Sequence, residues 1–285
     1  MLGVRGALSL LAGLALGLGC ARLAAASSAL HEEQLAAVAA SVGHMSPRTP
    51  GTNVFFLGFA GYGEQRVFHR EEELARSVFG ERFGSGAHSV ELVNDIHDRA
   101  AHPLASVPNL REALRLIGRR MNRADDVLVL MLTSHGSPDD GIAVTNGALL
   151  DDALTPRALR RALDEAGIRW RIVVVSACYA GIFIPVLKSD TTLVMTAADA
   201  RHSSFGCADD RDLTYFGEAL LHDAMPGACS LPAAFAAAQR IIRRRESEER
   251  EPHSNPQLWI GRAMPRKLAE LGGGARGERC AGQTR

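Results

Sequence analysis

The chain has 285 residues, of which 46% are hydrophobic and 5% aromatic, so it is long enough to bury one sizeable core. Basic and acidic residues are equal at 32 each, and the formal net charge of zero argues against nucleic acid or an anionic surface as a partner. The five cysteines include no Cys-x-x-Cys pair, and no His-x-x-x-His spacing occurs, so we expect neither a bound metal nor another cofactor.

The first 26 residues have the layout of a secretory signal peptide. Arg5 precedes an apolar stretch over residues 7–19, which is followed by Cys20 and by a run of small residues. The stretch is shorter than a membrane-spanning helix requires. Cleavage after Ala26 would release a soluble protein, whereas cleavage before Cys20 would leave a lipid anchor on that cysteine. We therefore expect export, giving either a periplasmic protein or one anchored through Cys20 to the cell envelope.

Helix and strand patterns alternate through most of the remaining chain. Residues 27–51 are predicted as a helical leader and a Pro/Gly linker, residues 52–265 as one α/β domain, and residues 266–285 as a disordered tail. Strands are expected at residues 53–58, 89–93, 192–196 and 257–261, and in apolar runs that begin at 127 and 171. Helices are expected at residues 71–79, 109–121, 156–166, 214–222 and 232–245.

Two of the expected strands end on reactive residues. The first apolar run stops on Ser-His-Gly at His135, and the second stops on Ala-Cys at Cys178. The helix between them has clear boundaries, because Thr155 can cap it, Pro156 fits its first turn and Gly167 can end it. A crossover of about 40 residues with one helix usually joins neighbouring parallel strands, and it is almost always right-handed. The sequence therefore predicts His135 and Cys178 at the same edge of one sheet.

A thiol and an imidazole at one sheet edge have the layout of a cysteine nucleophile with a general acid and base. A thiolate attacks a carbonyl carbon far better than a thiol does, and His135 can stabilise the thiolate of Cys178 and later protonate a leaving amine. The apolar segment 182–187, after Gly181, is expected to begin a helix whose amino-terminal dipole favours the anion. The N–H groups of Gly136 and Cys178 are candidates for an oxyanion hole.

The motifs at these strand ends resemble those of a known family. Ser134-His135-Gly136-Ser137 and Ala177-Cys178, each after an apolar strand, are similar to the pattern of the legumain-like C13 cysteine peptidases, which also include the catalytic subunit of the glycosylphosphatidylinositol transamidase. The resemblance continues through residues 196–207 and Tyr215-Phe216-Gly217-Glu218. It implies a caspase-like fold, in which a mostly parallel α/β sheet of about six strands forms the middle of a three-layer sandwich.

The resemblance also implies a reaction, the cleavage of a peptide bond through a thioester intermediate. Cys178 corresponds to the nucleophile and His135 to the general acid and base, while the amides of Gly136 and Cys178 bind the oxyanion. The substrate is then a peptide or protein. The chain departs from the family at Ala60, where the family has an asparagine that orients the histidine.

The same family prefers Asn, or less often Asp, before the cleaved bond, and this preference identifies candidate substrate-binding residues. Ser203 and Ser204 correspond to the serines that line the specificity pocket, and Glu218 to its acidic residue. A gapless comparison places Arg66 at the pocket arginine, so Arg66 and Glu218 are expected to recognise a side-chain amide together. Ser176 stands where the family has another acidic residue.

Several alternatives remain open from the sequence alone. The same acyl-enzyme can be captured by an amine, which would make the protein a transamidase or ligase. Residues 58–63 carry three glycines after a strand and would suit a nucleotide-binding α/β protein, although their spacing is not Gly-x-Gly-x-x-Gly. A catalytically silent binding protein is disfavoured because both reactive residues are present. Finally, an oxidising compartment would allow Cys207 and Cys229 to pair, while Cys207, Cys229 and Cys280 can equally be unpaired thiols.

Overall fold

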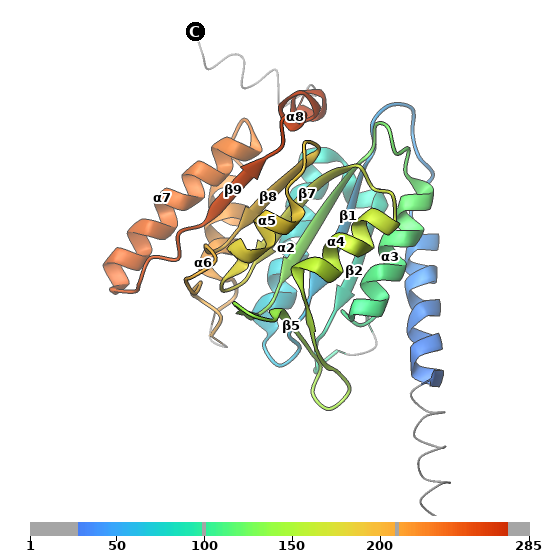
Figure 1. Ribbon diagram of the computed structural model, residues 1–285, viewed down its shortest axis with the longest axis horizontal. Coiled ribbons are helices and arrows are strands. Elements are labelled where there is room, and N and C mark those ends of the chain that lie inside the picture. Colours follow the sequence, from blue (N-terminus) through green and yellow to red (C-terminus); the bar gives the residue numbers. More distant parts are fainter. Residues whose placement is uncertain (1–27, 99–100, 209–210, 273–285) are drawn as a thin grey trace, which may run out of the picture.

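The fold is built on a six-stranded sheet whose strands are parallel except for one at the edge (Figure 1). The structure is a computed structural model, which describes residues 28–98, 101–208 and 211–272. The order of the strands across the sheet is β2 (Ser89–Val93), β1 (Val54–Ala60), β3 (Val127–Thr133), β7 (Trp170–Ser176), β8 (Thr192–Thr196) and β9 (Gln257–Ile260). β9 is the antiparallel strand.

Helices cover both faces of this sheet, because its strands are apolar on both sides. Phe55, Leu57 and Phe59 of β1 pack on one face, and Phe56 packs on the other. The first face is covered by the helix over residues 28–43 and by α3 (Val107–Arg120), α4 (Pro156–Glu165) and α5 (Ile184–Leu187). The second face is covered by α2 (Arg66–Phe83), α6 (Tyr215–Gly217), the π-helix Glu218–Ala224, α7 (Leu231–Glu249) and α8 (Met264–Gly272). The predicted three-layer sandwich is confirmed.

Side-chain caps explain where several helices begin. Ser106 caps α3, Thr155 caps α4 and Ser230 caps α7, each by accepting a hydrogen bond from the backbone N–H three residues later. Gly167, just beyond α4, has a left-handed φ of 67°, as its predicted role in ending the helix requires. The crossover from β3 to β7 therefore contains the expected helix, and β3 and β7 are neighbours.

A second, small sheet lies in the same crossover and was not predicted. It consists of β4 (Gly136–Ser137), β5 (Gly141–Thr145) and β6 (Asp151–Leu154), paired antiparallel. β4 is only two residues long and β6 begins with two exposed aspartates, so neither shows the alternation that identifies a strand. The sheet matters for the site, because β4 starts directly after His135 and the Ala143 N–H donates to the His135 carbonyl at 2.9 Å.

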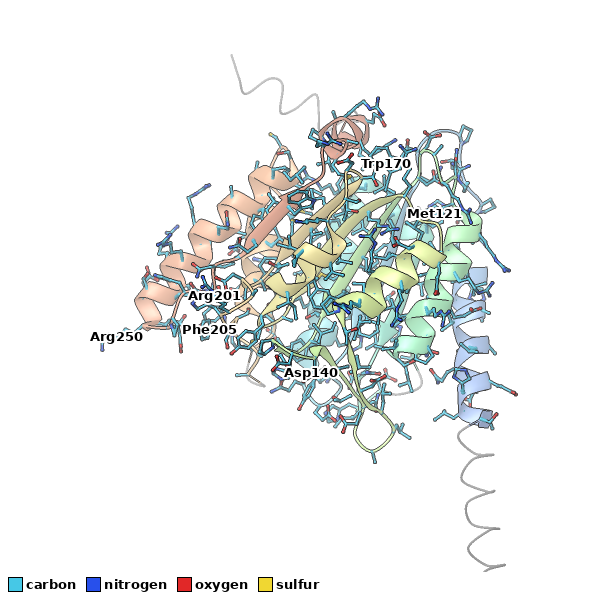
Figure 2. All side chains as sticks on the ribbon, viewed as in Figure 1. Met121, Asp140, Trp170, Arg201, Phe205 and Arg250 are labelled. Carbon is cyan, nitrogen blue, oxygen red and sulfur yellow. The ribbon has the colours of Figure 1, made fainter. Side chains whose placement is uncertain are left out.

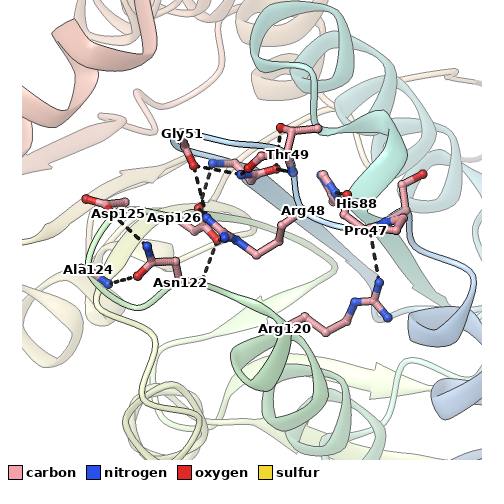
Figure 3. A network of polar contacts seen from close by, with 12 residues as sticks. Pro47, Arg48, Thr49, Gly51, His88, Arg120, Asn122, Ala124, Asp125 and Asp126 are labelled. Atoms are coloured by element: carbon pink, nitrogen blue, oxygen red, sulfur yellow. Dashed lines mark hydrogen bonds and ion pairs between the residues drawn. The ribbon is translucent and has the colours of Figure 1, made fainter.

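A buried carboxylate fastens the segment before β1 to the start of β3 (Figure 3). Asp126 accepts hydrogen bonds from the Arg48 guanidinium at 2.5 and 2.8 Å, from the Asn53 N–H at 2.9 Å and from the Asn122 N–H at 2.7 Å. These contacts lower the pKa of Asp126, although its burial opposes them. Because Asn53 and Asp126 directly precede β1 and β3, the network holds the two strand starts together.

One sequence expectation is wrong. Residues 266–272 belong to α8, where Lys267 is buried, so the disordered tail does not begin at 266. Of the alternatives left open for the cysteines, neither holds for both residues, because Cys207 is a free thiol whereas Cys229 is in a disulfide. The predicted signal peptide and the tail after residue 272, with Cys20 and Cys280, lie outside the described residues. Within the described residues, no helix has the length and apolar character needed to span a membrane.

Candidate active site

The ends of β3 and β7 bring His135 and Cys178 to the same level of the sheet. In the parallel pairing of these strands Thr133 is the partner of Ser176, and each candidate residue follows two positions later. The register continues past the strands, because the Ser134 N–H donates to the Ser176 carbonyl at 3.2 Å. The structure therefore places the imidazole and the thiol at the carboxyl edge of two neighbouring strands.

Other loops gather at the same edge. Figure 2 shows Asp140, from the loop after β4, on the same side of the sheet as Arg201 and Phe205, which follow β8. Met121, at the end of α3, and Trp170, at the start of β7, lie at the opposite end. In open sheets with parallel strands, ligands bind outside the carboxyl ends of the strands, which is the edge that holds His135 and Cys178.

Gly136 lies directly against the backbone of Cys178. A Cβ atom added to Gly136 would be 2.1 Å from the Cys178 carbonyl oxygen, so no larger residue fits without movement. The His135 carbonyl accepts a hydrogen bond from the Ala143 N–H of β5. Hydrogen-bonded and non-bonded residue pairs alternate along antiparallel strands, so Gly136 and Ile142 form a non-bonded pair and the Gly136 N–H points away from β5. Among the described residues, the Cys178 N–H has no hydrogen-bond acceptor. Both amides are thus available to a ligand.

Aromatic side chains and one amide hold the His135 ring. Tyr62 and Phe68 meet it edge-on, with ring centroids 4.5 and 5.0 Å away. Its Nε2 atom lies 2.6 Å from Oε1 of Gln65, and the tautomer that suits this contact has the proton on Nε2 and leaves Nδ1 as the basic nitrogen. Burial lowers the pKa of His135, although the Glu64 carboxylate opposes this effect. The ring is therefore neutral and able to accept a proton at neutral pH.

Cys178 stands at a sharp turn after β7. Tyr179, which follows it, has a left-handed φ of 56°, and its N–H donates to the His202 carbonyl at 2.9 Å. The Cys178 sulfur accepts a hydrogen bond from the Ser204 N–H at 3.2 Å and lies 3.4 Å from the Ser204 carbonyl. The expected helix is present as a 3₁₀ helix, Ala180–Phe183, that continues into α5. The segment after β8 thus contacts both the Cys178 thiol and the turn behind it.

The two serines of this segment differ from Ser176 in position. Ser203 is half-buried, with its hydroxyl 3.4 Å from the Tyr179 hydroxyl, and Ser204 contacts Cys178 through its backbone. Ser176 is buried, and its hydroxyl lies 3.3 Å from that of Thr214. Ser204 therefore contacts the thiol, Ser203 lies beside Tyr179, the residue after Cys178, and Ser176 is buried at the end of β7.

Arg66 and Glu218, which were expected to bind a side-chain amide together, have different partners in the structure. The Arg66 side chain is 56% exposed and lies 3.7 Å from Asp95, while Glu218 pairs with Arg245 at 2.6 Å and with Arg211 at 3.0 Å. No ion pair joins Arg66 to Glu218 in the described part of the chain. The reason is that α7 and the loop before α6 supply two arginines next to Glu218, which a gapless comparison of the first strand cannot reveal.

Comparison with known proteins identifies the family. The model of the peptidase C13 family matches residues 116–266, which include β3, β7 and both candidate catalytic residues. The chain belongs to the peptidase C13 family. It is accordingly a cysteine-type peptidase, a hydrolase that acts on peptides or proteins, and the predicted legumain-like membership is confirmed.

The structural comparison agrees with the C13 assignment at the level of the fold. A crystal structure of caspase-1 from Spodoptera frugiperda superimposes with a TM-score of 0.50 and 10% sequence identity, over 75% of this chain and 92% of the caspase. The predicted caspase-like fold is thus confirmed. No curated protein sequence matches the chain.

Two residues of this C13 peptidase that border the site were not found from the sequence. Gln65 contacts His135 from the residue before α2, where its only sequence signal is its place ahead of a helix. Glu71, on α2, is fully buried beside Ser176 and Thr214, and burial raises its pKa to about 7 although these hydroxyls lower it. A glutamate in a charged run such as Arg-Glu-Glu-Glu is usually exposed, so the sequence carried no signal of its burial.

The glycines after β1 are explained by close packing in this peptidase. A Cβ atom on Gly58 would lie 1.7 Å from the Glu72 carboxyl, and one on Gly61 would lie 2.6 Å from the Ala143 carbonyl. Gly63 likewise faces the Thr145 carbonyl, at 3.1 Å. The segment that suggested a nucleotide-binding protein therefore joins β1 to α2 and to the small sheet. The described residues contain no cluster of His, Cys, Asp or Glu suited to a metal ion.

Proposed function

We propose that the protein is an endopeptidase in which Cys178 is the nucleophile and His135 the general acid and base. The observation that carries this proposal is the shared register of β3 and β7, with both residues two positions beyond paired strand residues. The basic Nδ1 of His135 is the proton acceptor left by the Gln65 contact. Gln65 takes the orienting role for which Ala60 has no suitable side chain.

The proposed reaction follows from these groups. The Cys178 sulfur attacks the carbonyl carbon of the substrate while His135 takes the thiol proton, and the oxyanion accepts hydrogen bonds from the Gly136 and Cys178 amides. His135 then gives the proton to the leaving amine as the C–N bond breaks, which leaves a thioester. Water attacks the thioester with His135 as base, and it releases the carboxylic acid and the thiol.

We also propose a preference for Asn, then Asp, before the cleaved bond. Ser204 contacts the thiol with Ser203 next to it in the chain, and the ion pairs of Glu218 with Arg211 and Arg245 offer hydrogen-bond donors and an acceptor close together, as a side-chain amide requires. Arg66 is not needed in this arrangement. A panel of internally quenched peptides varied at this one residue tests the preference, and equal cleavage of the Asn, Ala and Lys members would contradict it.

The nucleophile is tested with two single-cysteine changes. Cys178→Ala is expected to reduce kcat/KM by at least about 1,000-fold, as removal of a catalytic nucleophile does. Cys207→Ala is the matched control, since it removes the second free thiol of the described residues and is expected to retain activity. Cleavage by Cys178→Ala at the wild-type rate would overturn the assignment.

For localisation we propose export. The apolar segment at residues 7–19 and the disulfide of Cys229 both support an oxidising compartment outside the cytoplasm. The mass of the mature amino terminus in the producing cell distinguishes a free residue after Ala26 from a lipid-modified Cys20. An intact Met1 in the mature protein would contradict both outcomes.

A further inference from the structure

Two consecutive glutamates of α2, Glu71 and Glu72, are fully buried. Carboxyl groups are almost never fully buried unless they are paired, because removing the charge from water is costly. In the described part of the chain, no well-aligned hydrogen bond reaches any of their four carboxyl oxygens. The proposed reaction uses neither group, so their burial requires another explanation.

Glu72 lies near β1 and the edge strand β2, two and three strands away from β7, which leads to Cys178. Its carboxyl occupies the space that Gly58 leaves open on β1, and its charged neighbours are Glu91 on β2 and Arg76 and Glu73 on α2. Burial and the Glu91 carboxylate raise its pKa well above the usual value. Glu72 is thus a buried acid of the same helix with no connection to the nucleophile.

Glu71 lies under the catalytic edge instead. The groups around it are the hydroxyls of Thr133 at the end of β3, Ser176 at the end of β7 and Thr214 before α6. Gly217 leaves room for it, since a Cβ atom there would lie 2.5 Å from the Glu71 carboxyl carbon. Ser176 stands two residues before Cys178, so Glu71 connects the strand of the nucleophile to the turn that begins α6.

One titratable group close to Glu71 is the Cys207 thiol. Cys207, in the segment that also carries Ser204, has its pKa raised to about 12 by burial and by the nearby Cys178 and Glu71. The groups from β3, β7 and the Thr214 turn are neutral hydroxyls, and no ion pair with a cation is formed by Glu71 within the described residues. When Glu71 keeps its proton it can donate to a hydroxyl of this cluster, whereas its ionisation leaves an uncompensated charge beside the Cys207 thiol.

We propose that Glu71 is a positioning residue of the peptidase, which in its protonated form holds the end of β7 against the Thr214 turn and which lowers activity when it ionises. The ionised carboxylate loosens the hydroxyl cluster under Ser176 and so displaces the end of β7, which carries Cys178 two residues later. This inference rests on the proposed nucleophile. Because the ionisation of Glu71 lowers activity, the enzyme is expected to be more active on the acid side of neutrality than at pH 8.

The test compares the pH profiles of kcat/KM for wild type, Glu71→Gln and Glu72→Gln between pH 5.5 and 8.5. The glutamine at 71 mimics the protonated acid, so the ratio of variant to wild type is expected to rise from about one at pH 6 to about tenfold at pH 8, following the ionisation of a group with a pKa of about 7. For Glu72→Gln, the matched control, the ratio is expected to be constant. A constant ratio for Glu71→Gln as well would overturn the proposal.

A second readout needs no substrate. The alkylation of Cys178 by iodoacetamide, followed by peptide mapping, is expected to be faster at pH 8 in Glu71→Gln than in wild type, and equal in the two at pH 6. Glu71→Met, which removes the charge with a similar volume, serves if the glutamine variant does not fold, and it is expected to behave the same way. Equal alkylation rates in Glu71→Gln and wild type at pH 8 as well as at pH 6 would contradict the role of Glu71. Activity of Cys178→Ala would instead contradict the assignment of Cys178 as the nucleophile. Failure of the proposed function and failure of the Glu71 proposal are therefore distinguished.

Discussion

Replacement of Glu71 by glutamine is expected to change the pH dependence of stability. The folded state holds the Glu71 pKa at about 7, against an ordinary value of 4.5, so between these values the unfolded chain has lost a proton that the folded protein keeps. Stability therefore falls as pH rises through this window. One pKa unit corresponds to about 1.4 kcal/mol, so the ionisation of Glu71 is expected to lower the free energy of unfolding by about 3 kcal/mol between pH 4 and pH 8.

Urea unfolding followed by circular dichroism measures this effect, with Cys178→Ala as the background to prevent self-cleavage. The difference in free energy of unfolding between Glu71→Gln and its parent is expected to rise by about 3 kcal/mol from pH 4 to pH 8. The unfolding is carried out without a reducing agent, because Cys229 is in a disulfide. A difference that is independent of pH would mean that Glu71 ionises in the folded protein as it does in the unfolded chain, and it would contradict the raised pKa of Glu71.

The other predictions concern single contacts. Gly136→Ala is expected to reduce kcat/KM by at least about 100-fold, since its methyl group collides with the Cys178 carbonyl and displaces an oxyanion donor; a fully active variant would contradict the packing. Gln65→Ala is expected to lower kcat with little change in KM and to alter the acid limb of the pH profile set by His135; an unchanged profile would exclude the orienting role. Asp126→Ala is expected to cost about 3–5 kcal/mol in urea unfolding, because it leaves buried donors unpaired, and a loss under 1 kcal/mol would refute this.

The sheet could be predicted from the sequence because its strands are apolar on both faces. Four of the six strands, β1, β3, β7 and β8, are buried along their whole length and carry runs of Val, Ile, Leu, Met or Phe. The capped helix before Gly167 indicates that β3 and β7 are parallel, as the structure has them. The edge shared by His135 and Cys178 follows from that pairing. The small sheet could not be predicted, since β4 has two residues and is formed only through its contact with β5.

The surroundings of the two candidate catalytic residues could be predicted only in part. Ser203 and Ser204 were found because they follow a strand in a recognisable motif, and the structure brings Ser204 to the thiol. The contact of Glu218 with Arg245 could not be predicted, because Arg245 is 27 residues away on α7 and is one of several arginines in a charged run. Gln65 and Glu71 contribute through tertiary contacts, which no local pattern records.

In the proposed reaction, Cys178 carries the acyl group during turnover. Acid quenching of the wild-type enzyme during turnover of a peptide ester, followed by mass spectrometry of the digested protein, detects this intermediate. We expect an acyl thioester on the peptide that contains Cys178, and none in Cys178→Ser. Continued turnover with no acyl group on Cys178, or with the acyl group on Cys207, would contradict the proposed reaction.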